Sequence, residues 1–170
     1  NYGEARRINA GSPEPLWTGG FNTELSWRGI SLGIQLEARY GNKVLNQDRS
    51  LFEADGSYGD SNIWKGAMNY WKKPGDTNVL PKPVYNNSSN SSAISTRYLE
   101  DGSYLRIKDI TLAYSLPSKW TKKALMSGVR IYASALNLYT FHNMNYWDPE
   151  HGTSGVTIIS YPMTRSMIVG

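Results

Sequence analysis

The sequence predicts an all-β fold: an antiparallel β-barrel segment of about five long strands, part of a larger transmembrane barrel. The first observation is a strict alternation of apolar and polar residues over 30–40, with a similar one over 129–135. The second is the polar segment 41–102, which is longer than the connections of a compact sandwich. The third is an aromatic content of 12 Tyr and 6 Trp against 3 Phe, the amphipathic kind that gathers at interfaces.

Composition removes several classes of function. The chain has no Cys, so neither a disulfide framework nor a thiolate zinc site is possible. The net charge of +4 is mild, and basic residues cluster only in the short segment 117–130, so we expect no nucleic-acid partner. No apolar run approaches the ~20 residues of a membrane-spanning helix. A spanning barrel strand needs only weak alternation and remains possible.

The first elements are a loop over 1–20, rich in Gly and Pro, and a hairpin over 21–40 that turns at Arg28-Gly29. Residues 30–40 alternate most cleanly and, at ~3.3 Å per residue, would extend roughly 36 Å, enough to cross a hydrocarbon core when tilted. A sandwich strand with one wet face is an equally good interpretation of this stretch alone. Its length and strict alternation are what a barrel wall requires.

Residues 41–102 are predicted to form an extracellular loop. Inside it, residues 60–62 could cap a short helix that runs through Ile63, Trp64, Ala67 and Met68 to Trp71, and we expect that helix to lie over the barrel mouth. The remaining residues of this loop are rich in Asn, Ser, Gly and Pro.

A second hairpin is predicted over 103–141. Leu105 and Ile107 occupy odd-numbered positions, whereas Ile110 and Leu112 occupy even-numbered ones, so in a regular strand the two pairs would face opposite sides of the sheet. We therefore predict an extra residue, a β-bulge, near Lys108-Asp109. The Pro117 turn follows, then a strand from Val129, a second extracellular loop over 142–163 and the start of the last strand over 164–170. Aromatic residues mark the strand ends. We expect an outer set at Tyr40, Tyr104, Tyr139 and Phe141, and an inner set at Trp27, Tyr114 and Trp120.

Several stretches together resemble one family. The hairpin reads Tyr104-Leu105-Arg106-Ile107-Lys108-Asp109-Ile110-Thr111-Leu112-Ala113-Tyr114-Ser115-Leu116-Pro117, followed by Val129-Arg130-Ile131-Tyr132 and Asn137-Leu138. Four further stretches contribute to the resemblance: Pro15 before Gly19-Gly20-Phe21-Asn22, Gly41-Asn42-Lys43, Tyr146-Trp147-Asp148-Pro149-Glu150 and Tyr161-Pro162-Met163-Thr164-Arg165. In this order they resemble the C-terminal barrel region of SusC/RagA-family TonB-dependent outer-membrane transporters.

The resemblance implies energy-coupled import of an oligosaccharide, or sometimes a peptide, across the outer membrane of a Gram-negative bacterium. It also implies a SusD-like surface lipoprotein as partner, contact with outer-membrane lipid, and coupling to TonB through an N-terminal plug region absent from these residues. The chain would then be a fragment of such a transporter. The alternatives are a soluble all-β carbohydrate-binding module, in which a second sheet would cover Ile30, Leu32, Ile34 and Leu36, and an extracellular adhesin fragment.

The sequence shows no enzyme signature, and we expect neither catalytic residues nor a cofactor. His142 and His151 fit no helical ligand spacing and are interpreted as loop histidines rather than metal ligands. Asp148 and Glu150 could bind a cation or act as an acid–base pair, but a Pro149 turn with exposed acids is the simpler interpretation. The candidate ligand-binding residues are loop aromatics whose flat faces suit sugar rings: Tyr58, Trp64, Trp71, Tyr146 and Trp147.

A second polar set is predicted on the inner face of the strands. It comprises Gln35, Glu37, Arg39, Arg130 and Ser134. We expect these side chains to contact the plug or neighbouring strands more than ligand.

Overall fold

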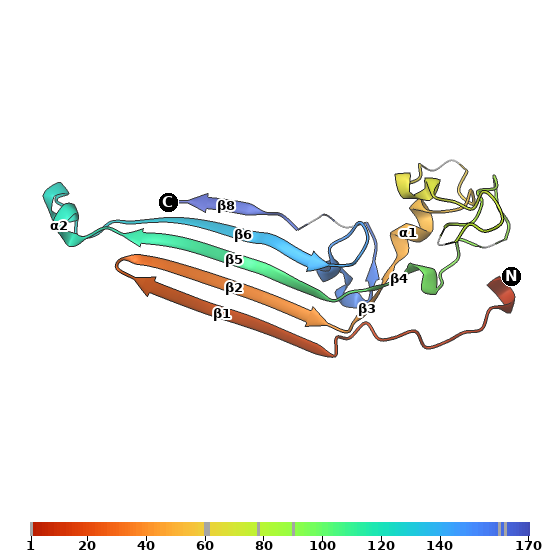
Figure 1. Cartoon of the computed structure of the whole chain (residues 1–170), viewed down its shortest axis with the longest axis horizontal. Helices are drawn as coiled ribbons and strands as arrows, with labels where there is room; N and C mark the ends of the chain where they lie inside the picture. Colours follow the sequence, from red (N-terminus) through yellow and green to blue (C-terminus); the bar gives the residue numbers. More distant parts are fainter. Residues whose placement is uncertain (1, 60–61, 78, 90, 160, 162) are drawn as a thin grey trace.

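The computed structural model describes residues 2–59, 62–77, 79–89, 91–159, 161 and 163–170. A five-stranded sheet with the order β1-β2-β5-β6-β8 forms one long wall (Figure 1). The segments between β2 and β5 and between β6 and β8 form a second unit, the loop module, which contains a three-stranded sheet of order β4-β3-β7 and lies at one end of the wall. The strands of the wall are β1 (Trp17–Trp27), β2 (Ile30–Tyr40), β5 (Tyr104–Ser115), β6 (Arg130–His142) and β8 (Ser166–Val169). Every pairing in this wall is antiparallel.

The β1–β2 hairpin turns at the predicted position. Arg28 and Gly29 both have positive φ, at 48° and 88°, which matches the twist of the flanking strands in a two-residue turn. Strand β1 begins at Trp17 rather than at the predicted Phe21, although Gly19 and Gly20 lie inside it. A methyl group on Gly19 would lie 2.4 Å from Cζ2 of Trp17, so the indole covers the space that this glycine leaves empty.

The wall has one apolar and one polar face, as the alternation predicts. Strand register places the following residues on the apolar face: Trp17, Phe21, Leu25, Trp27, Ile30, Leu32, Ile34, Leu36, Leu105, Ile107, Ile110, Leu112, Tyr114, Ile131, Ala133, Ala135, Met167 and Val169. Phe21, Leu25, Leu112 and Ile131 are all more than half exposed, so the chain does not bury this face against a second sheet. The polar set predicted from Gln35 to Ser134 lies on the opposite face.

The predicted bulge is confirmed. Ile107 pairs with Leu36 and Asp109 pairs with Gln35, so Lys108 is the extra residue of β5. The extra residue moves the side-chain parity by one position, which keeps both Leu105 and Ile110 on the apolar face. Next to it, β6 also departs from regular pairing, and Asn137 adopts a left-handed φ of 50°.

The loop module has more structure than the sequence predicts. Its sheet consists of β3 (Lys43–Asn46), β4 (Leu99–Asp101) and β7 (Val156–Thr157), with β7 parallel to β3. Its core is largely polar, because Asn42, Asn46, Asp48, Glu53 and Glu100 are buried beside Val44 and Tyr98. Buried polar side chains give no alternating apolar signal, which is why these strands are not visible in the sequence.

The helices are short and lie mainly in the loops. The α-helices are α1 (Gln47–Phe52) and α2 (Ser118–Thr121), and the 3-10 helices are η1 (Tyr2–Glu4), η2 (Lys65–Met68), η3 (Thr96–Tyr98), η4 (Lys122–Ala124) and η5 (Pro149–Ser154). The expected loop helix is reduced to the single turn η2, since Tyr70 instead forms a β-bridge with Leu80. Of its predicted cap, Asp60 and Ser61 lie outside the described residues. No helix in the described part of the chain is long and apolar enough to cross a membrane.

Candidate functional site: a loop docked on the polar face

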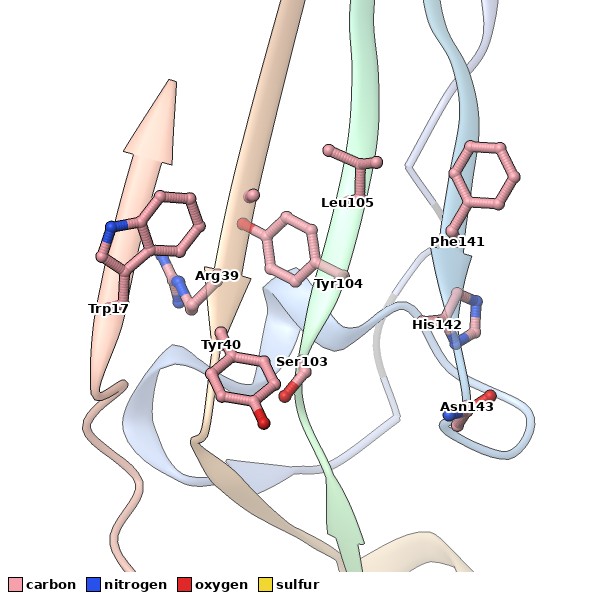
Figure 2. A pocket seen from close by; sticks show the side chains of 10 residues that line it. Trp17, Arg39, Tyr40, Ser103, Tyr104, Leu105, Phe141, His142 and Asn143 are labelled. Carbon is pink, nitrogen blue, oxygen red and sulfur yellow. The ribbon is translucent and has the colours of Figure 1, made fainter. Parts of the chain in front are cut away.

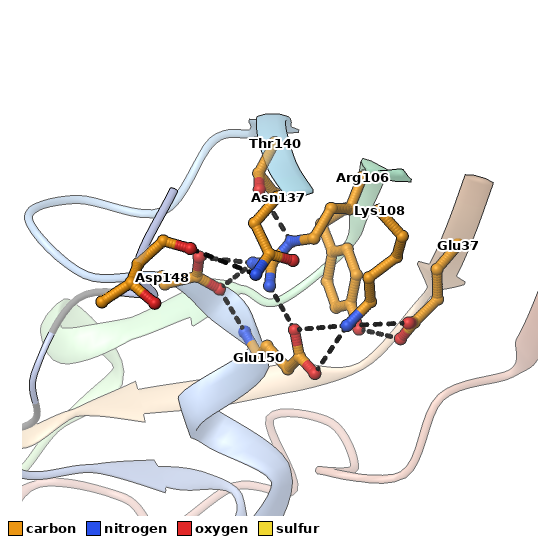
Figure 3. Close-up of polar contacts among 9 residues, drawn as sticks. Glu37, Arg106, Lys108, Asn137, Thr140, Asp148 and Glu150 are labelled. Atoms are coloured by element: carbon orange, nitrogen blue, oxygen red, sulfur yellow. Dashed lines mark hydrogen bonds and ion pairs between the residues drawn. The ribbon is translucent and has the colours of Figure 1, made fainter. Parts of the chain in front are cut away.

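A buried arginine joins the wall to the loop that follows β6. Arg106 on β5 is 0% exposed, and its two terminal guanidinium nitrogens donate to Asp148 and Glu150 (Figure 3). The remaining donor, Nε, lies 2.8 Å from Thr140 Oγ1 on β6. The guanidinium therefore holds two carboxylates of the loop and one hydroxyl of the neighbouring strand.

A fully buried cation is tolerated only when it is paired and hydrogen-bonded. The planar guanidinium fork meets this requirement with two carboxylates, a geometry that an ammonium group does not provide. Pro149 is buried between these acids, and the Glu150 backbone N–H donates to Asp148 Oδ1 at 2.9 Å. The start of η5 thus holds both carboxylates toward Arg106.

The expectation of exposed acids at 148–150 was wrong for this reason. The turn at Pro149 is present, but its acids are partly buried counter-ions. The sequence contains a signal for this arrangement, because the polar position between Leu105 and Ile107 is an arginine and an Asp-Pro-Glu turn follows on the next loop. Spacing alone does not pair them, since the partners are separated by the whole β5–β6 hairpin.

The bulge extends the network. Lys108 Nζ lies 3.1 Å from Glu37 Oε2 on β2 and 3.2 Å from Glu150 Oε1 (Figure 3). The Tyr104 hydroxyl donates to Glu37 Oε1 at 2.7 Å. Three strands and one loop therefore share one chain of charges and hydrogen bonds. Tyr104 is only 4% exposed and belongs to this polar face, so its prediction as an outer-interface aromatic was wrong.

Aromatic residues form a cluster beyond the network. Trp64 stacks on Tyr146 with ring centroids 3.9 Å apart, and it lies 4.8 Å from Phe52 and 6.4 Å from Trp147. The structure thus brings together Trp64, Tyr146 and Trp147 of the predicted ligand-binding set. No ring pair among the described residues joins Tyr58 or Trp71 to this cluster.

Two clefts meet at Tyr146. The first has a volume of about 280 Å³ and lies between β6 and the loop; its lining comprises Asn137, Thr140, His142, Tyr146, Trp147, Asp148, Met163 and Arg165. The second, of about 380 Å³, lies within the loop module and includes Arg49, Glu53, Asn69, Arg97 and Tyr146. Half of the Tyr146 side chain remains exposed, so its ring is available to a molecule in either cleft.

The charges around these clefts are held in fixed positions. Burial opposes the charge of Arg49, but hydrogen bonds to Glu53 and Glu100 more than offset it and raise the pKa of Arg49. Burial, with the nearby Glu53 carboxylate, raises the pKa of the Tyr146 hydroxyl and keeps it a neutral hydrogen-bonding group. The first cleft adds Arg165 and His142 at its margin. These groups suit recognition of a polar molecule by stacking and hydrogen bonding.

The described residues contain no group of three or more His, Asp or Glu side chains placed to hold a metal ion. His142 is the last residue of β6, and the side chain of His151 lies outside the described residues. Asp148 and Glu150 pair with Arg106, so these two acids serve to dock the loop on the wall.

Comparison with known proteins decides the family. No family model matches the chain. TonB-dependent receptor P3 of Formosa agariphila is 30% identical over 98% of the chain, and TonB-dependent receptor P26 of the same organism is 27% identical over 94%. The structure titled as the RagAB peptide importer in the closed-closed state aligns over 95% of the chain with 31% identity and a TM-score of 0.77. The chain is a barrel segment of a SusC/RagA-type TonB-dependent transporter.

The segment covers 17% of the length of either Formosa receptor and 17% of the RagAB chain. A second RagAB structure, titled as a peptide transporter, gives a TM-score of 0.78 at 31% identity. Membership places the segment in the outer membrane of a Gram-negative bacterium. The soluble carbohydrate-binding alternative is therefore wrong, in agreement with the exposed apolar face of the wall.

The apolar and polar faces of the wall lie in different environments. In outer-membrane barrels the apolar face contacts lipid and the polar face lines the interior. At the loop end of the apolar face, Trp17, Tyr40 and Phe141 surround a hollow of about 530 Å³ (Figure 2). The Arg106 network lies on the interior face, and the aromatic cluster lies beyond it in the loop module.

Proposed function

We propose that this segment forms part of the wall and extracellular mouth of a transporter that imports oligosaccharides or peptides. In this proposal the loop module contacts the ligand, TonB supplies the energy through a plug region, and a SusD-like surface lipoprotein delivers the ligand. The observation that carries the proposal is the loop docked on the interior face by Arg106. This docking supports the proposal because the Trp64–Tyr146–Trp147 cluster lies in the same loop region, where we expect an entering molecule to meet it.

The relatives favour peptides as the first ligand class to test. The RagAB structures that resemble this segment are titled as a peptide importer and a peptide transporter. The cleft beside Tyr146 combines aromatic faces with Arg165, His142 and the amide of Asn137, groups that suit a peptide backbone and its terminal carboxylate. Aromatic faces also suit sugar rings, so oligosaccharides are the second class.

The test measures growth of the bacterium that carries the full-length transporter, with either a protein digest or a mixture of neutral oligosaccharides as the carbon source. Tyr146→Ala in the full-length transporter removes the ring shared by both clefts. We expect it to reduce uptake of the imported class about tenfold, the loss of about one to two stacking contacts. Trp71→Ala is the matched control, because Trp71 lies outside the aromatic cluster although it was predicted as a ligand-binding residue.

Deleting the gene of a SusD-like lipoprotein in the bacterium that carries this transporter tests the partner. Loss of uptake with a normal amount of transporter in the membrane would support delivery by a SusD-like protein. Growth unaffected by this deletion, by loss of TonB and by Tyr146→Ala on both carbon sources would contradict the proposed function.

A further inference from the structure

A groove crosses the apolar face at the end opposite the loop module. Its volume is about 620 Å³, and its lining includes Ile30, Leu112, Tyr114, Ile131, Ala133 and Val169. Ala133 is paired with Leu112 on one side and with Val169 on the other. A small side chain between two longer ones leaves a depression, so Ala133 forms the floor of the groove.

A cation lies at the end of this groove. Arg28 of the β1–β2 turn contributes to its lining, and the guanidinium is held 4.8 Å from the centroid of the Trp27 ring. The ion pairs among the described residues do not include Arg28. Arg28 is thus a positive group at the edge of an apolar groove, without an acidic partner in the described structure.

More positive charge lies at the same end of the wall. The Gly29 carbonyl accepts from the Ser115 backbone N–H at 2.7 Å, which holds the β1–β2 turn beside the last residue of β5. The chain then continues into α2 and η4 at this end of the wall (Figure 1). Lys119, Lys122 and Lys123 in these two short helices are exposed. No Asp or Glu occurs between Leu116 and Arg130. An apolar groove therefore leads toward a basic margin.

We propose that this groove is a binding site for an anionic phospholipid of the periplasmic leaflet. One acyl chain lies over Ala133, between Leu112 and Val169, and the phosphate lies beside Arg28. The occupant is a lipid because the groove belongs to the lipid-facing side of the wall, and an anionic one because its margin is basic. The leaflet assignment rests on the proposed function, which places the loop module outside the cell.

The test uses the full-length transporter, purified in a non-ionic detergent and titrated with phosphatidylglycerol or phosphatidylethanolamine. Native mass spectrometry counts the lipids that remain bound. Arg28→Gln should weaken phosphatidylglycerol binding about fivefold, the effect of about one basic residue near an anionic lipid. It should change phosphatidylethanolamine binding less, because that headgroup carries no net charge.

Ala133→Trp fills the groove and should abolish the tightest phosphatidylglycerol adduct, and Ala133→Leu should weaken it with a smaller change in packing. Ala135→Trp is the matched control, because Ala135 lies on the same strand and face, between Ile110 and Met167, but outside the groove. Equal phosphatidylglycerol binding by wild type, Ala133→Trp and Ala135→Trp would overturn the site. Equal retention of the two lipids by wild type would overturn its preference for anionic lipid.

The lipid-binding experiment and the uptake assay distinguish failure of the proposed groove from failure of the proposed import function. Ligand uptake that is absent in the wild-type transporter, together with an intact, Ala133-dependent lipid adduct, would contradict the proposed import function and leave the groove supported. Normal uptake by a transporter whose lipid binding ignores both Arg28 and Ala133 would contradict the groove and leave import supported.

Discussion

The position of the loop that follows β6 depends on Arg106, because Arg106 pairs with Asp148 and Glu150 of that loop. Its side chain is completely buried, and each of its donor groups has an acceptor on another element. Lys108 makes similar ion pairs, but it is partly exposed, as is its partner Glu37. Buried charges without partners are costly, whereas exposed pairs contribute little. The two cations should therefore differ strongly when they are replaced.

Arg106→Leu should release the loop that contains Asp148 and Glu150. Breaking a buried ion pair costs about 3–5 kcal/mol, so loop opening should become at least about a hundredfold more frequent, which corresponds to the lower bound of that cost. Limited proteolysis of the full-length transporter in outer-membrane preparations measures the cleavage rate within residues 142–163.

The matched control is Arg130→Gln, since Arg130 is exposed and makes one 3.4 Å hydrogen bond to Ser31. Its cleavage rate should stay at the wild-type value. Lys108→Ala should produce a small increase, reflecting about 1 kcal/mol or less. A cleavage rate for Arg106→Leu equal to that of Arg130→Gln would show that the loop is held by other contacts.

At the scale of the element, the β5 bulge reconciles two demands on one strand. Arg106 must face the interior to meet the loop, and Ile110 must face lipid. A regular strand places residues 106 and 110 on the same face, because side chains alternate with period two. The extra residue Lys108 changes the parity between them. The bulge thus allows a charged binding-loop anchor and a lipid-facing stripe within one strand.

Deleting Lys108 should prevent assembly of the barrel. Without the extra residue, one end of β5 must turn its apolar residues inward and Arg106 toward lipid. Arg106 would then lose both of its carboxylate partners, which costs about 3–5 kcal/mol for a buried ion pair. The measurement is the fraction of full-length transporter that reaches the outer membrane in a folded, heat-modifiable form. Lys108→Ala keeps the residue count and should assemble normally. A deletion variant that assembles as well as Lys108→Ala would refute this role of the bulge.

The sequence locates this bulge because both of its sides alternate regularly. Leu105 and Ile107 establish one parity and Ile110 and Leu112 the other, so the position of the change is a local property of the chain. The loop module carries no such signal. Its core contains Asn42, Asn46, Asp48 and Glu100, residues that resemble solvent-exposed loop in sequence. Only their burial, together with the hydrogen bonds that Glu100 accepts from Asn46 and Asn145, identifies a folded unit.

At the scale of the whole molecule, the wall separates two unlike ends. The loop module with its aromatic cluster lies at one end, and the short β1–β2 turn with the basic α2 segment lies at the other (Figure 1). Long loops on the outside and short turns on the inside are the usual arrangement of outer-membrane barrels. The lipid-facing groove and the ligand clefts would then serve opposite sides of the membrane.

Cysteine labelling tests this orientation. The segment contains no native Cys, so single cysteines at Ser88 and Ser127 can be placed in a cysteine-free full-length transporter. A membrane-impermeant maleimide should label Ser88→Cys in intact cells and Ser127→Cys only after the outer membrane is permeabilised. Both positions are exposed; Ser88 belongs to the loop between α1 and β4, and Ser127 follows α2 and η4. These two segments lie at opposite ends of the wall (Figure 1). The reverse pattern would place the loop module in the periplasm and refute the leaflet assigned to the groove.

The sequence by itself determined the long strands, their two faces, the β1–β2 turn and the bulge. Each follows from a period-two pattern or a turn pair, and such patterns act between residues that are near in the chain. Only the tertiary structure decided that Arg106 binds Asp148 and Glu150, that Tyr104 faces inward, and that Trp64 meets Tyr146 and Trp147 while Tyr58 and Trp71 lie apart. These contacts join segments that are distant in sequence, and their geometry exists only once the strands are paired and the loop is folded back.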